Sequence, residues 1–378
     1  MLKPRKCRIA PPSRSPDPRR ESGPVGAFGV LPSARDPNHP NVKNPLRSRT
    51  FQTIASIVLG VGLLAFFLSR VPLADIGRQI AAISTPWLLT AMALSLFVFV
   101  VRTTRWIWIL RPVGEVPFFP AFRATAIGFA ANTVLPARAG EVLRPALLAR
   151  ERGLPFSALL ASILFERVLD ALAQLSFFAF ALAGPDASRM GSLGSTRVRV
   201  LAGAVAVGAI VVALFAVAWR TTTERLIGRM FRILPERLRP AAERIAHTFL
   251  DGFASLKTPR LALLVGAGSL AMWMVINIQI YCIMRAFGLE LPISAAFVVT
   301  TAAVLGLFVP TPGGVGGYHA AVQFALTSVF QVPIATATGV ALIAHAVSFV
   351  PISIIGFGLF AASPARREGF SSLVKPAP

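Results

Sequence analysis

Cysteine and histidine are scarce in this sequence, and their positions exclude several kinds of site. The two cysteines, Cys7 and Cys282, lie far apart and have no spacing typical of a zinc site or a disulfide framework. The four histidines form no metal-ligand motif. Nucleotide-binding loops, catalytic triads and polar stretches long enough for an ordinary catalytic domain are also lacking. We therefore expect no metal, no cofactor and no catalytic residues, although enzyme activity stays open.

Acidic residues are few as well, with 16 Asp and Glu against 38 Lys and Arg and a formal net charge of +22. In a soluble protein, so basic a composition would indicate nucleic-acid binding. Here 54% of the residues are hydrophobic, which is above the range of soluble proteins. The basic residues flank apolar stretches, as they do in membrane proteins. The expected partners are therefore membrane lipids and not nucleic acid, and a homodimer stays open.

The apolar stretches predict an all-α polytopic integral membrane protein. About six of them are long enough to be full spans: 51–68, 87–110, 158–183, 200–219, 261–284 and 334–360. The second span is interrupted near its end by Arg102 and Arg105, while Trp106 and Trp108 suit an interfacial aromatic belt.

The remaining parts of the chain predict its domain organisation. Residues 1–50 are rich in proline and basic residues and predict a disordered cytoplasmic tail, or a variable extension from an upstream start codon. A membrane domain follows at 51–362. Within it, residues 220–260 predict an amphipathic helix at an anionic membrane surface or a cytoplasmic connector packed on the bundle. Residues 363–378 predict a polar, basic C-terminal tail.

Two shorter apolar segments, 118–152 and 295–330, are broken by proline and glycine. If the basic segments before and after each broken segment both lie in the cytoplasm, an even number of membrane crossings must separate them. Counting every apolar piece as a crossing gives an odd number instead. Backbone that is not helical is tolerated at membrane depth only where protein buries it or water reaches it. We therefore predict two re-entrant helical hairpins, with both termini on the cytoplasmic side of a bacterial inner membrane. The alternative is that the first loops alone set the orientation.

The two broken segments resemble each other in pattern. Each has a short helix of small residues, a proline stop, a polar or glycine-rich turn, a second helix and a second proline. Each is followed by a long span with ionisable residues. Paired broken segments in two halves of a membrane protein point to a transporter binding site. The sequence therefore predicts two pseudo-repeats with a site between them.

Charged side chains gather around the first break. Asn132 precedes it, where it could cap the helix or bind freed backbone groups, and Arg138, Glu141 and Arg144 follow it. Arginine suits bidentate recognition of phosphate. A salt-bridged turn explains the same residues equally well.

The span at 158–183 carries Glu166, Arg167 and Asp170. Glu166 and Asp170 are four residues apart and share a helix face, and Arg167 lies within pairing distance of Asp170. Charges at membrane depth are costly unless they are paired or reach water. We predict a wet cavity that receives a polar headgroup, and the alternative is a neutralised cluster that fixes helix packing.

The second turn contains Gly313, Gly314 and Gly316, followed by His319 and, within the last span, His345. Glycine N–H groups could cradle a phosphate, although a tight packing turn is the more common use of such glycines. Membrane histidines are more often packing residues than ligands. We include all five residues in the candidate substrate site.

The motifs N-x-x-L-P-x-R-x-G-E-x-x-R from Asn132 to Arg144, E-R-x-x-D from Glu166 to Asp170, and the glycine-rich turn resemble those of one family. It is the lysylphosphatidylglycerol synthase transmembrane family, also called the flippase-like domain family. The resemblance covers about residues 50 to 362. Where the family often has glutamate and arginine, this chain has His319 and His345, which raises the alternative of a pH-sensitive pair.

The resemblance implies a flippase-like function. In multiple peptide resistance factors, this membrane unit is thought to flip an aminoacylated phospholipid, and a separate soluble domain transfers the amino acid. That domain is not expected here, because the chain ends soon after its last span. The resemblance implies binding and translocation of a phosphate-bearing or aminoacylated (glyco)lipid. The alternative is an accessory protein or enzyme subunit of glycolipid, polyprenyl or hopanoid synthesis.

Overall fold

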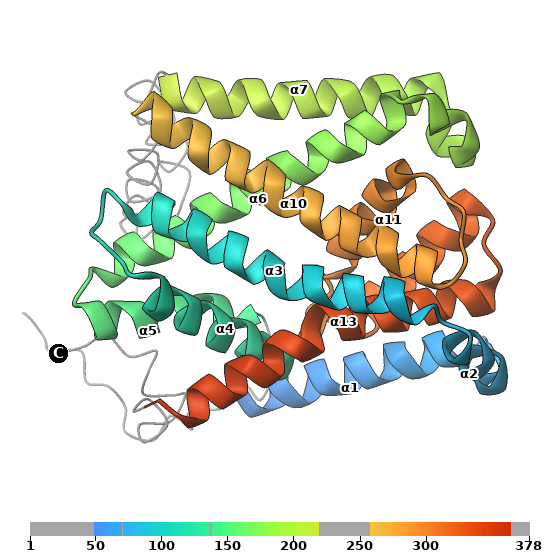
Figure 1. Ribbon diagram of the computed structural model, residues 1–378, viewed down its shortest axis with the longest axis horizontal. Coiled ribbons are helices and arrows are strands. Elements are labelled where there is room, and N and C mark those ends of the chain that lie inside the picture. Colours follow the sequence, from blue (N-terminus) through green and yellow to red (C-terminus); the bar gives the residue numbers. More distant parts are fainter. Residues whose placement is uncertain (1–48, 70, 136–137, 219–257, 364–378) are drawn as a thin grey trace, which may run out of the picture. The chain divides into compact units, whose positions relative to one another are not determined.

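The computed structural model describes residues 49–69, 71–135, 138–218 and 258–363. The predicted N-terminal tail, the 220–260 segment and the C-terminal tail lie almost entirely outside these residues. Every regular element within them is helical, which confirms the predicted all-α fold (Figure 1).

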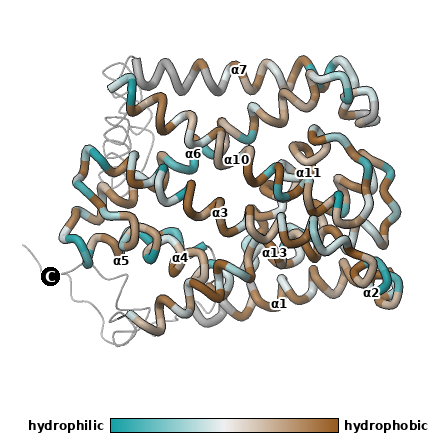
Figure 2. Tube along the Cα trace, in the orientation of Figure 1, coloured by the Kyte–Doolittle hydropathy of each residue, from teal (hydrophilic) through white to brown (hydrophobic). Residues whose placement is uncertain are grey.

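The six predicted spans each correspond to a helix. They are α1 Arg49–Leu68, α3 Thr85–Leu110, α6 Phe156–Ala183, α7 Thr196–Ala218, α10 Pro259–Ala286 and α13 Ile334–Ala361. Among the described residues, α3, α10 and α13 are long and apolar enough to cross a membrane by themselves. Figure 2 shows mainly hydrophobic residues along these three helices and more hydrophilic ones in α2 and the connections. The multi-pass membrane character is clear, and the number of six spans stays a prediction.

Prolines define where many of the helices begin. Proline fits the start of a helix because the first turn has no partner for its backbone N–H groups. Five helices follow a proline directly: α2 Leu73–Ala81, α4 Phe118–Val134, α6, α11 Ile293–Gly306 and α13. The proline pattern of the two broken segments therefore gives each of them the same order of helices.

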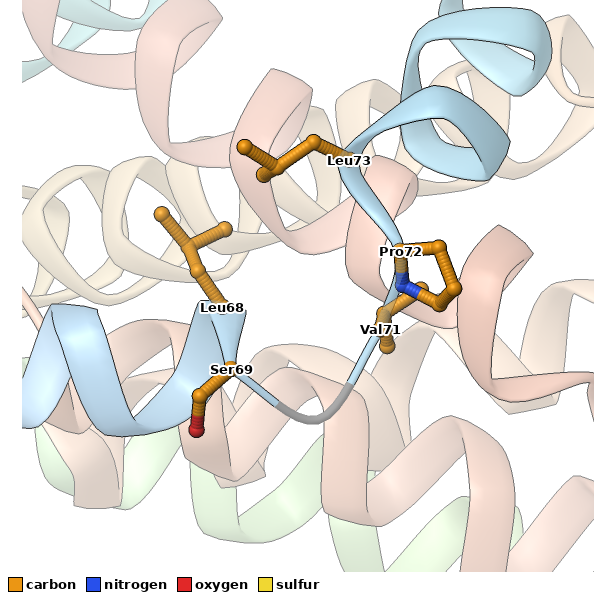
Figure 3. Close-up of a pocket in the computed structure, with 5 residues that line it drawn as sticks. All are labelled: Leu68, Ser69, Val71, Pro72 and Leu73. Carbon is orange, nitrogen blue, oxygen red and sulfur yellow. The ribbon is translucent and has the colours of Figure 1, made fainter.

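The short helix α2 follows a bend after α1 and was not predicted from the sequence. The axes of Ile57–Leu68 and Leu73–Ala81 meet at 83°. The bend holds a pocket of about 470 Å³ lined by Leu68, Ser69, Val71, Pro72 and Leu73 (Figure 3). The described lining residues carry no charged side chain.

The first broken segment forms a tight pair of helices, α4 and α5 Gly140–Arg152. A Cβ atom added to Gly140 would lie 1.9 Å from the carbonyl oxygen of Gly128, so the two helices touch through their backbones. α5 ends at Gly153, whose φ of 65° is the left-handed conformation that commonly closes a helix. The predicted helix, turn and helix are present, and their path relative to the membrane stays a prediction.

The second broken segment has a similar arrangement. α11 is followed by the short η5 turn Pro312–Gly314, then by α12 Gly317–Phe324, η6 Ala325–Val329 and α13. Gly306 and Gly317 bring α11 and α12 together, because a Cβ on either would lie 2.4 Å from the carbonyl oxygen of the other. The order α4, α5, α6 therefore matches the order α11, α12, α13.

The two repeats meet at their turns. α13 packs along α4, α3 packs along α10, and η5 contacts α4 and α1 (Figure 1). A Cβ on Gly313 would lie 3.6 Å from the Cα and the carbonyl oxygen of Thr133, in the last turn of α4. The largest hydrophobic core cluster lies around α10 to α13 and includes Phe67 of α1 and Ala91 of α3. The charged residues of α6 lie outside that core.

Candidate functional site

Two buried carboxylates on α6 form the centre of the charged site. Glu166 is 0% exposed and Asp170 is 4% exposed. Arg105 of α3 joins them: its Nη2 donates to Glu166 Oε1 at 2.8 Å, and its Nη1 donates to Asp170 Oδ1 at 2.7 Å. One guanidinium group therefore spans both carboxylates, as their spacing of four residues on one helix face allows.

A second arginine comes from the first broken segment. Arg144 of α5 donates from Nη1 to Glu166 Oε2 at 3.0 Å. Its guanidinium carbon lies 3.8 Å from the centre of the Trp106 ring, within cation–π distance. Trp106 in turn donates from Nε1 to Ser162 Oγ at 2.9 Å. These contacts connect α3, α5 and α6 in the interior.

Arg102 is the third buried arginine, and it is paired much less closely. Its Nη1 lies 3.6 Å from Glu166 Oε1 and 3.7 Å from Asp170 Oδ2, which is too far for hydrogen bonds. Its guanidinium lies 5.0 Å from the Phe129 ring centre. It is 6% exposed, and its Nε and Nη1 atoms have no hydrogen-bond partner among the described residues.

α10 supplies the fourth side of the cluster. Ser269 Oγ accepts a hydrogen bond from Arg105 Nη1 at 3.0 Å, and Trp273 Nε1 donates to Asp170 Oδ1 at 3.1 Å. These two residues are four apart on one face of α10. Four helices from distant parts of the sequence therefore contribute to one polar network.

A series of less buried charges leads outwards from this network. Arg167 Nη2 lies 3.1 Å from Asp170 Oδ2, and Arg167 Nη1 lies 3.9 Å from Glu141 Oε1. Arg138 Nε lies 3.5 Å from the same Glu141 oxygen. The side-chain exposures are 31% for Arg167, 28% for Glu141 and 46% for Arg138. The charges thus run from a half-exposed turn into the interior.

The interior has more positive than negative charge. Among the described residues, Arg102, Arg105 and Arg144 are buried with two carboxylates, and adding the outer Arg167 and Glu141 leaves the same excess of one. Several guanidinium nitrogens have no hydrogen-bond partner among the described residues: Nε of Arg102, Arg105, Arg144 and Arg167, Nη1 of Arg102 and Nη2 of Arg144. Buried charged donors of this kind are normally paired. The cluster therefore contains charged donors that no described side chain satisfies.

The structure brings together most of the residues that the sequence pointed to around the first break. Glu141, Arg144, Glu166, Arg167 and Asp170 belong to one network, with Arg138 at its edge. Asn132 lies elsewhere, at the contact between α4 and α5. Its buried Oδ1 has no hydrogen-bond partner among the described residues and would lie 2.6 Å from a Cβ on Gly140.

Sequence reasoning missed Arg102 and Arg105 as members of the site. The spacing of three residues between them on a membrane helix was the available signal, because it puts both on one face. Assigning Trp106 to an interfacial belt was wrong: it is 0% exposed and packs under Arg144. Ser269 and Trp273 had no signal of their own, because nothing local relates α10 to α6.

The glycine-rich turn lies apart from the arginines and is packed. Gly313, Gly314 and Gly316 are buried, with positive φ values of 62°, 70° and 87°. Gly314 N–H donates to Thr311 O at 3.0 Å, and Gly316 N–H donates to His319 Nδ1 at 3.2 Å. Two of the candidate phosphate donors are therefore engaged within the turn, which favours the packing interpretation.

His319 and His345 lie next to each other beside that turn, with ring centres 4.6 Å apart. No group of three or more His, Cys, Asp or Glu side chains in the described residues has an arrangement that could hold a metal ion.

The fold and site together define a class: an all-helical, multi-pass membrane protein with a buried, net-positive polar cluster between two broken repeats. Comparison with known families agrees with this class. The family model of the lysylphosphatidylglycerol synthase TM region matches residues 53–356. The chain belongs to this family.

Curated relatives are distant and include two kinds of protein. A glycosyltransferase, AglD, of Haloferax volcanii is 26% identical over 344 residues, which is 82% of this chain and 54% of that protein. The chain therefore spans about half the length of this relative. A UPF0104 membrane protein of Methanothermobacter thermautotrophicus is 25% identical over 286 residues, which is 69% of this chain and 80% of that protein. A further UPF0104 membrane protein from the same organism is 26% identical over 287 residues.

Proposed function

We propose that this protein binds a phosphate-bearing lipid headgroup at the arginine and carboxylate cluster and moves that lipid across the membrane. The observation that carries the proposal is the buried excess of positive charge. An unpaired buried charge costs several kcal/mol, on the order of the penalty for breaking an internal ion pair. A phosphate anion would offset that cost, because guanidinium groups bind it through two parallel hydrogen bonds.

The arginines would have separate roles in binding. Arg105 is held on both carboxylates and Ser269, so it acts as part of the framework. Arg102 and Arg144 keep free donor atoms and would bind phosphate oxygens. A headgroup would enter past the half-exposed Arg138 and Arg167. Glu166 and Asp170 keep the arginines in place until the headgroup arrives.

A flux experiment with Arg102→Gln tests the proposal. In liposomes, flux of a labelled phosphate-bearing lipid should fall about tenfold or more, as expected for the loss of one charged hydrogen bond. Stability should stay level or rise, because Arg102 makes no hydrogen bond in the described structure through Nε or Nη1. The panel should include a neutral glycolipid without phosphate, whose movement should not respond to the substitution.

The matched control is Arg285→Gln. Arg285 also lies on a membrane helix and near an aromatic ring, 5.9 Å from the Trp87 ring centre, but it pairs weakly with Glu290 at 4.0 Å. Its replacement should leave flux unchanged. If Arg102→Gln alters stability alone and leaves flux at the wild-type level, the cluster is a packing device and the transport role is refuted.

An accessory or enzymatic role in envelope-lipid synthesis is the second candidate, and the similarity to a glycosyltransferase is what favours it. The same cluster would then hold the phosphate of a lipid donor during group transfer. Purified protein that turns over a lipid donor without any flux would support this candidate over the first.

Both termini are proposed to lie on the cytoplasmic side of a bacterial inner membrane, with the first turn entered from that side. Arg138→Cys in a Cys7→Ser background should then react with an impermeant thiol reagent from the cytoplasmic side. The side chain of Arg138 is 46% exposed, whereas Cys282 is buried. Labelling of position 138 from the periplasmic side alone would contradict this orientation.

A further inference from the structure

The proposed function does not use the two histidines beside the glycine-rich turn. His319 lies in the first turn of α12 and is 4% exposed, and His345 lies in the middle of α13. Their rings are tilted by 40° with centres 4.6 Å apart. Phe67 packs 5.5 Å from His319, and Phe349 stacks 4.5 Å from His345. The pair is therefore enclosed largely by aromatic rings.

Backbone hydrogen bonds determine which ring nitrogens carry protons. Gly316 N–H donates to His319 Nδ1, so that nitrogen must be unprotonated. His345 Nε2 lies 2.8 Å from the carbonyl oxygen of Gly313, which can only accept, so this nitrogen must carry a hydrogen. In a neutral imidazole only one ring nitrogen carries a proton, so the hydrogen bond that one nitrogen makes determines whether the other is protonated. His319 is thus neutral in this structure, and each ring holds one backbone group of the turn.

A proton on His319 would remove one of these contacts. Nδ1 would become a donor facing the Gly316 N–H donor, so that hydrogen bond would be lost. It is the bond from the N-cap backbone to the third residue of α12, which closes the first turn of that helix. The charged ring would also lie against His345 and Phe67, with little water to solvate it. The closed conformation of the turn therefore disfavours protonation of His319.

No counter-charge in the described part of the chain compensates this effect. Phe67 of α1 and Phe349 of α13 pack against the pair, and Thr133 of α4 lies beside Gly313 of the turn. The titratable neighbour is Tyr318 of α12, whose ring centre is 5.2 Å from that of His345. Within the described residues, no Asp, Glu, Lys or Arg side chain forms an ion pair with either histidine. Protonation would therefore add an unpaired charge.

The turn that these bonds hold is one of the contacts between the two repeats. Gly313 packs on Thr133 of α4, and a Cβ on Gly316 would lie 2.4 Å from the Cβ of Leu63 of α1. Opening the first turn of α12 would free both contacts. A local change at His319 would thus reach the last turn of α4, which belongs to the same α4–α5 pair as Arg144.

We propose that His319 and His345 form a proton-binding site and that proton uptake releases the glycine-rich turn from α4 and α1. The closed turn requires neutral His319, so protons bind the open form better. By linkage, acidification shifts the equilibrium towards the open form. Uptake of one proton on opening changes the ratio of open to closed forms by up to about tenfold per pH unit. This site stands whether or not the protein moves a lipid.

Hydrogen–deuterium exchange on the full chain in lipid nanodiscs tests the site between pH 8 and pH 5. After correction for the intrinsic pH dependence of exchange, protection of residues 313–320 should fall about tenfold or more. Protection of the middle of α3 and α10 should stay constant and serves as the internal reference. Loss of protection throughout the protein, or none in 313–320, overturns the proposal.

The double variant His319→Asn with His345→Gln separates proton binding from packing. Asparagine keeps a side-chain oxygen that can accept from Gly316 N–H, and glutamine keeps an N–H that can donate to Gly313 O. Neither asparagine nor glutamine takes up a proton between pH 8 and pH 5, so the fall in protection of residues 313–320 should disappear. His247→Asn, which replaces a histidine outside the described residues, is the control and should retain the fall in protection. If the double variant does not fold, the single variant His319→Asn should show no pH-dependent fall in protection of residues 313–320. A fall as large as in the wild type would overturn the proposal.

Discussion

Replacing Gly140 with alanine should separate α4 from α5 and take apart the arginine and carboxylate cluster. The new Cβ would lie 1.9 Å from the carbonyl oxygen of Gly128 and 2.6 Å from Asn132 Oδ1. The first of these atoms belongs to backbone and has no side-chain freedom to move away. Arg144 lies one helical turn beyond Gly140, so its 3.0 Å bond to Glu166 would break. We expect a loss of about 3 kcal/mol or more of unfolding free energy.

Gly266→Ala provides the matched control. Gly266 also lies within a helix, but a Cβ there would meet no atom within 4 Å. Alanine should stabilise that position by up to about 1 kcal/mol, since glycine is a poor helix former. Unfolding by denaturant in detergent micelles, followed by tryptophan fluorescence, measures both variants. Similar unfolding midpoints for the two variants would refute the close contact at Gly140.

Glu166→Gln should be the most damaging change of charge in the described structure. Glu166 accepts hydrogen bonds from both Arg105 and Arg144, and it is 0% exposed. Its neutralisation would leave three buried arginines with Asp170 as their buried carboxylate. Breaking a buried pair by removing one partner costs about 3–5 kcal/mol. The unfolding midpoint in detergent should fall accordingly, and flux should fall with it.

A second substitution tests whether this loss comes from the charge imbalance. Adding Arg144→Met to Glu166→Gln removes one of the unpaired cations, so part of the lost stability should return. The coupling energy from the double-mutant cycle should exceed about 1 kcal/mol. Glu290→Gln is the control, because Glu290 is exposed and lies 4.0 Å from its arginine partner. Strict additivity of Glu166→Gln and Arg144→Met would rule out an interacting cluster.

The α6 carboxylates and the proline breaks were predictable because they depend on local geometry. The spacing of Glu166 and Asp170 by itself places them on one helix face. Proline disfavours the interior of a helix, so the order of helices in the two broken segments could be read directly, although Pro145 and Pro351 lie inside α5 and α13. The α2 helix, Leu73–Ala81, was missed because nine residues are too few for a membrane span.

The identity of the partners across helices was not predictable. Arg102 and Arg105 lie more than 60 residues from Glu166 and Asp170, and Ser269 lies about 100 beyond them. Their sequence positions indicate that they are costly in a membrane, but not which helix relieves that cost. Only the packing of α3, α6 and α10 against one another brings them together. The same packing decides that Arg105 is hydrogen-bonded through both of its Nη atoms and that Arg102 keeps Nε and Nη1 without a partner among the described residues.

Local features of the sequence are enough to predict an all-helical membrane protein with two broken segments and charged residues within its apolar spans. These properties follow from hydrophobic length, proline positions and residue spacing, all of which act over a few residues. The tertiary structure decided that the cluster has an excess positive charge and that His319 and His345 lie together on the glycine-rich turn. Both depend on contacts between segments that are distant in the sequence. A pattern of neighbouring residues does not show which of these contacts form.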